Sequence, residues 1–152
     1  MSTIKSKIDN DIKQAMLAGE KQLVTTLRGL KSAILYAEVA QGARDSGLSE
    51  DEIMKVLAKE AKKRQESADM YSQGGSDERA SKEMAEKKII EEYLPAKKTT
   101  EELARLVSEV VKELNASGPQ AMGQVISKVK ERTGSTADGA EIARITKEIL
   151  TK

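Results

Sequence analysis

Hydrophobic residues recur along most of the chain at steps of three and four residues, the spacing that places side chains on one face of an α-helix. The first run predicts an amphipathic helix over residues 4–19, with its apolar face built from Ile4, Ile8, Ile12 and Met16. A longer helix is predicted over residues 20–41. Its apolar positions are Leu23, Val24, Leu27, Leu30, Ile34 and Leu35.

Helix start signals divide the chain further. Ser49 has the character of an N-cap, and Glu52 stands three residues later, at the position that closes a capping box. This pair predicts that a third helix begins at residue 49 and runs to about Ser72, where a Gly-rich stretch ends it. A fourth helix is predicted over residues 77–93.

Pro95 marks the predicted domain boundary, because the residue before a proline disfavours the helical conformation. Beyond it, a helix is expected over residues 101–114 and a short one from Pro119 to about Gly134. Asp138 and Glu141 form a second capping-box pattern that opens the last helix. We therefore expect an all-α fold: an N-terminal domain of about four helices over residues 1–95 and a small three-helix C-terminal domain over residues 96–152.

The composition agrees with helices packed on helices. Aromatic residues are 2% of the chain and charged residues 34%, whereas strands favour aromatic and β-branched side chains. Several methionines stand at helical core spacing and are expected to fill a core that is short of aromatic rings. They are Met54, Met70, Met84 and Met122.

The residue types present narrow the chemistry. The chain has neither Cys nor His, so thiolate chemistry, the commonest zinc ligand and the usual general base near neutral pH are missing. Gly74-Gly75 lacks the spacing of a phosphate loop, and adjacent carboxylates such as Glu91 and Glu92 diverge on a helix. We expect no metal, no cofactor and no catalytic residues, although an enzymatic role stays open. With no apolar signal segment and no run of about 20 apolar residues, a cytoplasmic location and no membrane contact are expected.

The densest basic run is Lys59 to Arg64, on the predicted third helix. Such a run can hold phosphates, but a solvated helix face with Glu60 and Arg64 paired one turn apart is the favoured interpretation. Basic residues of the second helix stand among its apolar positions, which suggests a polar cluster with a structural role. The expected members are Arg28, Lys31, Glu60, Lys63 and Arg64.

A second basic group surrounds the small-residue loop that leads into the last helix. Free backbone N–H groups and the positive end of the helix dipole suit an anion at such a helix start. The candidate contacts to RNA phosphates are Lys128, Lys130, Arg132, Gly139, Arg144 and Lys147. An alternative is that these basic residues only complement a helix C-terminus, with Asp138 as a cap. Both interpretations stay open at this point.

Several segments in the same order resemble the YqeY-like family, which is related to the tail domain of the B subunit of the tRNA-dependent amidotransferase that forms glutamine or asparagine. They include Leu27–Ile34, Leu48–Glu52, Glu91–Pro95, Met122–Ile126 and Ala137–Gly139. The stretches Asp11–Met16 and Lys59–Ser67 match as well. Gln124 stands where the family pattern has Lys, which removes one charge from the expected RNA surface.

The resemblance implies a helical N-terminal domain and a tail domain of the kind that contacts tRNA in the amidotransferase. The leading hypothesis is therefore a tRNA- or structured-RNA-binding accessory protein, with an amidotransferase or a tRNA synthetase as candidate protein partners. One alternative is a component of a carbon–nitrogen ligase that uses glutamine as amido donor. Another is a helical protein–protein interaction module that uses the second and third helices as its face.

Overall fold

The computed structural model describes residues 3–152, except for the side chain of Ser135. The expected all-α fold is confirmed: the described residues form seven α-helices and no strand. These are α1 (Thr3–Leu17), α2 (Lys21–Ala40), α3 (Glu50–Gln73), α4 (Asp77–Glu91), α5 (Thr100–Glu113), α6 (Met122–Thr133) and α7 (Gly139–Leu150). The chain divides into two compact units, Met1–Leu94 and Pro95–Lys152, here called the first and second units. Within the described part of the chain, none of the helices has the length and apolar character that crossing a membrane requires.

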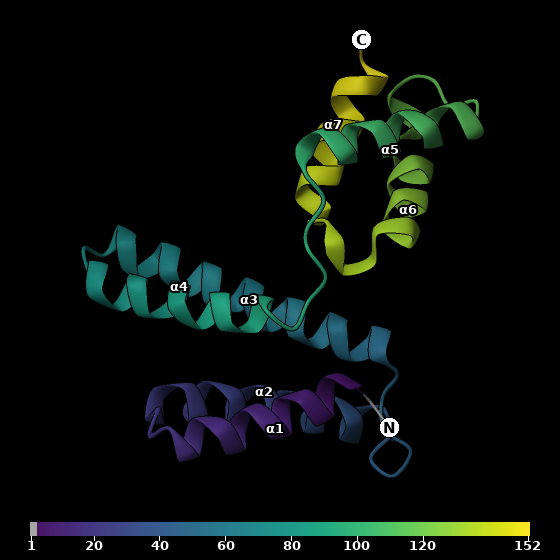
Figure 1. Ribbon diagram of the computed structural model, residues 1–152. Coiled ribbons are helices and arrows are strands. Elements are labelled where there is room, and N and C mark those ends of the chain that lie inside the picture. Colours follow the sequence, from purple (N-terminus) through teal and green to yellow (C-terminus); the bar gives the residue numbers. More distant parts are fainter. Residues whose placement is uncertain (1–2) are drawn as a thin grey trace. The chain divides into compact units, whose positions relative to one another are not determined.

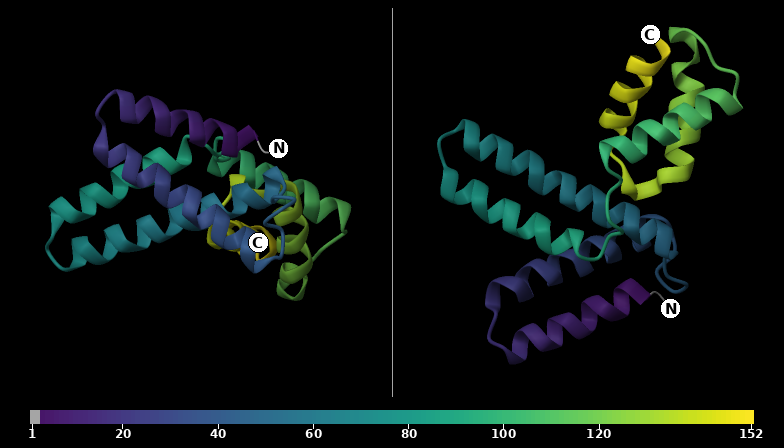
Figure 2. Two further views of the ribbon diagram at one scale, coloured as in Figure 1. Left: turned by 90° about the horizontal axis from the view of Figure 1, so that it is seen from below. Right: turned by 45° about the horizontal axis from the view of Figure 1, so that its top comes forward.

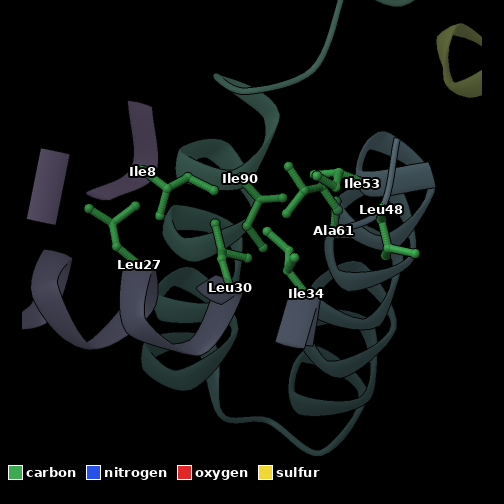
Figure 3. Packing of buried hydrophobic residues seen from close by; sticks show 9 residues of the cluster. Ile8, Leu27, Leu30, Ile34, Leu48, Ile53, Ala61 and Ile90 are labelled. Atoms are coloured by element: carbon green, nitrogen blue, oxygen red, sulfur yellow. The ribbon is translucent and has the colours of Figure 1, made fainter. Parts of the chain in front are cut away.

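The first unit consists of two helical hairpins, α1 with α2 and α3 with α4, which lie side by side in both sets of views (Figures 1 and 2). Their inward faces meet in one core. Figure 3 shows side chains from all four helices pointing toward one another there. The buried members are Ile8, Leu27, Leu30, Ile34, Leu48, Ile53, Leu57, Ala61 and Ile90. Each large aliphatic side chain contributes about 1.5–3 kcal/mol through its removal from water.

The far part of the α3–α4 hairpin is packed through small residues. Ala68 and Ala80 are buried there, whereas Met70 is 72% exposed and Met84 42% exposed. The expectation that these two methionines fill the core is therefore wrong. A two-helix hairpin has a single contact face, so residues on its outer sides have no third layer to cover them.

Two of the apolar positions predicted for the first hairpin also lie outside the core, Met16 at 56% exposed and Leu35 at 45% exposed. A four-residue step overshoots the 3.6-residue turn by about 40°, so Met16 has rotated away from the face that Ile8 marks. Ala15 is buried in its place. Leu35 directly follows the buried Ile34, and successive side chains on a helix diverge by about 100°.

A buried carboxylate joins α1, α2 and the loop before α3. Glu38 is 3% exposed, and its carboxylate accepts hydrogen bonds from the amine of Lys5, at 2.9 Å, and from the backbone N–H of Leu48, at 3.3 Å. The sequence contains no local signal for this arrangement, because the three residues are distant in the chain. The contact fixes the loop against both helices of the first hairpin.

A second polar contact ties the end of the first unit to its beginning. The phenol of Tyr93 donates a hydrogen bond to Asp11, with 2.5 Å between the oxygens, and the amine of Lys7 lies 5.2 Å from the centre of the ring. Burial, followed by the hydrogen bond to Asp11 and the charge of that carboxylate, holds the pKa of Tyr93 above its ordinary value. The residues before Pro95 are thereby fastened to α1.

The second unit is a three-helix core of α5, α6 and α7. Its buried residues are Leu103, Val107, Val110, Ala121, Val125, Val129, Ile142, Ile145 and Leu150. Pro119 begins a short 3₁₀ turn, η1 (Pro119–Ala121), rather than α6 itself. A second 3₁₀ turn, η2 (Gly134–Thr136), connects α6 to α7 and begins at Gly134, whose φ of +53° suits glycine.

Candidate functional site

The end of α6 and the start of α7 bring two of the expected RNA contacts together. Asp138 is the N-cap of α7, and its carboxylate accepts the N–H of Ala140 at 3.3 Å. A Cβ on Gly139 would lie 3.4 Å from the amine nitrogen of Lys130 and 3.3 Å from its Cε. The cation of Lys130 therefore lies directly beside the positive end of the α7 dipole. The absence of a side chain at Gly139 leaves room for this approach.

The other expected cations differ in how far nearby carboxylates neutralise them. Lys128 pairs with Glu131 at 3.5 Å, and Arg132 pairs with Glu113 of α5. Within the part of the chain that the structure describes, Lys130 and Lys147 form no ion pair. The six residues predicted to contact RNA thus do not form one cluster. Lys130 and Gly139 lie side by side. Lys147 is a further cation without an ion pair among the described residues.

The ion pair of Arg132 and Glu113 shifts the pKa of both side chains, although it lies at the solvent-exposed surface. The hydrogen bond from Arg132 lowers the pKa of the Glu113 carboxyl, and the same bond raises the pKa of the Arg132 guanidinium. Glu113 stands 19 residues before Arg132, so no sequence pattern marks it as a partner. A guanidinium that is held by a carboxylate has less charge to offer a phosphate.

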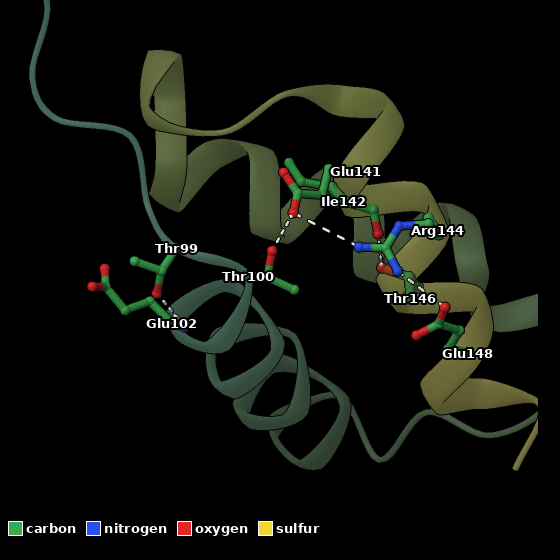
Figure 4. Close-up of polar contacts among 8 residues, drawn as sticks. All are labelled: Thr99, Thr100, Glu102, Glu141, Ile142, Arg144, Thr146 and Glu148. Atoms are coloured by element: carbon green, nitrogen blue, oxygen red, sulfur yellow. Dashed lines mark hydrogen bonds and ion pairs between the residues drawn. The ribbon is translucent and has the colours of Figure 1, made fainter.

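Arg144 is part of a network that connects α7 to the start of α5 (Figure 4). It lies 3.7 Å from Glu141 and 3.0 Å from Glu148, and Thr100 donates a hydrogen bond to Glu141 at 2.8 Å. Glu141 therefore turns to Thr100 and Arg144 rather than back to its own helix start. The four-residue spacing of Arg144 and Glu148 is a signal that sequence reasoning had missed.

The polar residues expected to cluster in the first unit form two separate groups. On the first hairpin, Lys31 pairs with Asp9 at 2.7 Å, and the guanidinium of Arg28 lies 3.9 Å from the sulfur of Met16. On the second hairpin, Lys63 and Arg64 both pair with Glu60. The distances are 3.2 Å for Lys63 and 3.8 Å for Arg64.

Arg64 also reaches across to α4, where it lies 3.0 Å from Glu86 and 3.9 Å from Glu83. It is thus the centre of three carboxylates on two helices. Sequence reasoning had not identified Glu83 or Glu86 as its partners, because they belong to another helix. This geometry holds α3 and α4 together and leaves the guanidinium little charge for an outside ligand.

Ser49 is the N-cap of α3. The Ser49 hydroxyl accepts the N–H of Glu52 at 3.2 Å and donates to the Glu52 carboxylate at 3.0 Å. No group of three or more acidic side chains that could hold a metal ion occurs among the residues described. The caps and ion pairs position helices, whereas Lys130 and Lys147 are exposed and form no ion pair among the residues described.

Comparison with known proteins gives one family and a set of fungal relatives. The model of the YqeY-like protein family matches residues 5–150. A protein from Kluyveromyces lactis named "Altered inheritance of mitochondria protein 41, mitochondrial" is 32% identical over 130 residues, which cover 83% of this chain and 69% of the relative. Proteins of the same name from Clavispora lusitaniae and Vanderwaltozyma polyspora are each 28% identical. They cover 86% and 95% of this chain and 76% and 79% of the respective relative.

These names correct one expectation. The cytoplasmic location inferred from the sequence is contradicted, because the relatives are named as mitochondrial proteins. The inference relied on the lack of an apolar signal segment. Mitochondrial targeting segments are amphipathic and rich in Arg and Ser rather than apolar, so that criterion does not test for them.

Proposed function

The chain belongs to the YqeY-like protein family, and we propose that it binds structured RNA through the α6–α7 end of its second unit. The observation that supports this most directly is the approach of the Lys130 amine to Gly139, at the N-terminus of α7. A helix N-terminus with an adjacent cation is a favourable place for a phosphate. The family relation to an amidotransferase tail that contacts tRNA favours RNA as the source of that phosphate.

The neutralised and unneutralised cations have different roles in this proposal. Lys130 and Lys147 supply the charge that attracts the RNA backbone, because neither is paired with a carboxylate among the described residues. Arg132 and Arg144 contribute less, since Glu113 and Glu141 already hold them. The names of the relatives favour mitochondria as the place where this binding occurs.

The test is a titration of the full chain with tRNA at several salt concentrations. The affinity is expected to fall as salt rises, because each phosphate contact releases a counterion. Lys130→Gln is expected to weaken binding and to reduce the salt slope by about 1. The matched control is Lys112→Gln on α5, another exposed lysine of the second unit that has no ion pair among the described residues.

Gly139→Ala gives a second test that leaves every charge in place. The new methyl group displaces the end of the Lys130 side chain by a few tenths of an ångström, since that end is flexible. Weaker tRNA binding with unchanged thermal stability is the expected result. If Lys130→Gln and Lys112→Gln have equal effects, or if no variant changes the salt slope, the proposed surface is wrong.

A further inference from the structure

A groove lies between α2 and α3 of the first unit, with a volume of about 860 Å³. Three small residues of α2 line it at four-residue steps: Gly29, Ala33 and Ala37. From α3 the half-buried Val56 adds apolar surface. Because these α2 residues have no side chain larger than a methyl group, another helix can approach closely.

The α2 side of this groove exposes apolar side chains. Tyr36 lines the groove and is 82% exposed, and the small apolar side chains of Ala33, Ala37 and Ala40 belong to the same lining. Scattered apolar residues are normal on a surface, but several on successive turns beside a groove mark an interaction site. An exposed tyrosine is also a side chain that contributes strongly to protein interfaces.

The α3 side of the groove is cationic. Lys55 and Lys59 stand one turn apart, are exposed, and form no ion pair with any residue that the structure describes. Of the two carboxylates in the lining, Glu60 pairs with Lys63, which also lines the groove, and Glu52 accepts a hydrogen bond from the Ser49 hydroxyl. The lining thus carries three lysines and two carboxylates, a net charge of +1, and its two unpaired cations lie beside the apolar floor.

We propose that this groove binds an acidic amphipathic α-helix of a partner protein. The apolar face of such a helix packs on the small residues of α2 and against Tyr36. Carboxylates one turn apart along one edge of the helix meet Lys55 and Lys59, whose spacing is the same. Charge complementarity thereby sets which edge of the bound helix faces α3, and the apolar floor supplies most of the contact area.

A protein helix suits this groove better than a nucleic acid does. The apolar floor has no counterpart in a phosphate chain but matches an aliphatic helix face. The groove belongs to the first unit, so this proposal goes beyond RNA binding by the second unit and is tested separately.

The probe is a fluorescent synthetic helical peptide of about 18 residues, long enough to cover the groove. Its leucines follow the i, i+3, i+4, i+7 pattern, and glutamates stand one turn apart along one edge. Fluorescence anisotropy measures its affinity for the full chain, and amide chemical-shift changes locate it. We expect saturable binding with shifts concentrated in residues 29–41 and 52–63.

A charge swap is the first variant. Lys55→Glu with Lys59→Glu is expected to weaken binding of the acidic peptide by at least about 10-fold and to strengthen binding of a peptide with lysines in place of its glutamates. The control is Lys13→Glu with Lys21→Glu, which changes net charge equally at exposed lysines away from the groove lining. Equal effects of the two double variants overturn the proposal.

Gly29→Leu is the second variant and fills the floor without altering charge. A Cβ at Gly29 meets no other atom within 4 Å, and Leu has the higher helix propensity, so the variant is expected to fold normally. It should lose peptide binding. Retained binding of the peptide overturns the proposal.

Two other results overturn the proposal as well. Displacement of the peptide by tRNA would identify the groove as a nucleic-acid site. A concentration-dependent dimer that Gly29→Leu abolishes would identify a second copy of this chain as the occupant.

Discussion

The amine of Lys5 lies 2.9 Å from the carboxylate of Glu38, a side chain that is only 3% exposed. The same carboxylate accepts the N–H of Leu48, so one buried charge holds α1, α2 and the loop before α3. Lys5 is partly exposed, and its cation compensates a carboxylate that would otherwise be costly to bury.

Lys5→Ala is therefore expected to lower the free energy of unfolding by about 1–2 kcal/mol, less than for a fully buried pair because water can reach the site. Urea unfolding followed by circular dichroism measures the change. Lys13→Ala, an exposed lysine of the same helix with no ion pair among the described residues, is the control and should cost less than about 0.5 kcal/mol. Equal losses for both variants would show that the buried carboxylate does not depend on Lys5.

Tyr93→Phe removes the hydrogen bond to Asp11 but keeps the ring beneath Lys7. At neutral pH we expect a loss of about 1–2 kcal/mol in unfolding free energy. The pKa of Tyr93 is raised in the folded state, so its contribution is complete below the unfolded pKa of about 10 and decreases as pH rises beyond it. The stability difference between wild type and variant should therefore shrink above about pH 10. A difference that stays constant to higher pH would contradict this role of the phenol.

Arg64→Met keeps an apolar stem but leaves Glu60, Glu83 and Glu86 without their shared cation. The mutual repulsion of these carboxylates is expected to cost about 1–3 kcal/mol and to speed hydrogen exchange in α4 more than in α5–α7. Added salt should restore part of the loss through screening. Lys62→Met, at an exposed position of α3, is the control. A loss that does not depend on salt would indicate packing rather than charge.

Glu113→Gln should increase the affinity for tRNA, because it releases the guanidinium of Arg132 from its carboxylate partner. A steeper salt dependence, by about 1 in slope, is expected with it. The control is Glu101→Gln, which changes net charge equally at an exposed residue of α5. If both variants bind alike, the gain comes from net charge and Arg132 is not a contact.

The helices themselves were predictable because their signals are local. Ser49 with Glu52 marks the start of α3, and the period of Leu27, Leu30 and Ile34 marks the buried face of α2. The same local pattern failed at Met16 and Met70, where exposure depends on whether a neighbouring helix is present. Periodicity identifies a face, but it does not say what covers each part of it.

The sequence by itself determined an all-helical chain, the N-caps Ser49 and Asp138 and the absence of Cys and His, because these follow from composition and from contacts within a few residues. Only the tertiary structure decided which cations remain available: Arg132 is held by Glu113, and Arg64 by carboxylates of another helix, whereas Lys130 lies beside Gly139. It also created the buried charge of Glu38 and the groove between α2 and α3. The physical reason is that neutralisation and burial depend on distances between residues that are far apart in the chain, and those distances are set by how the helices pack.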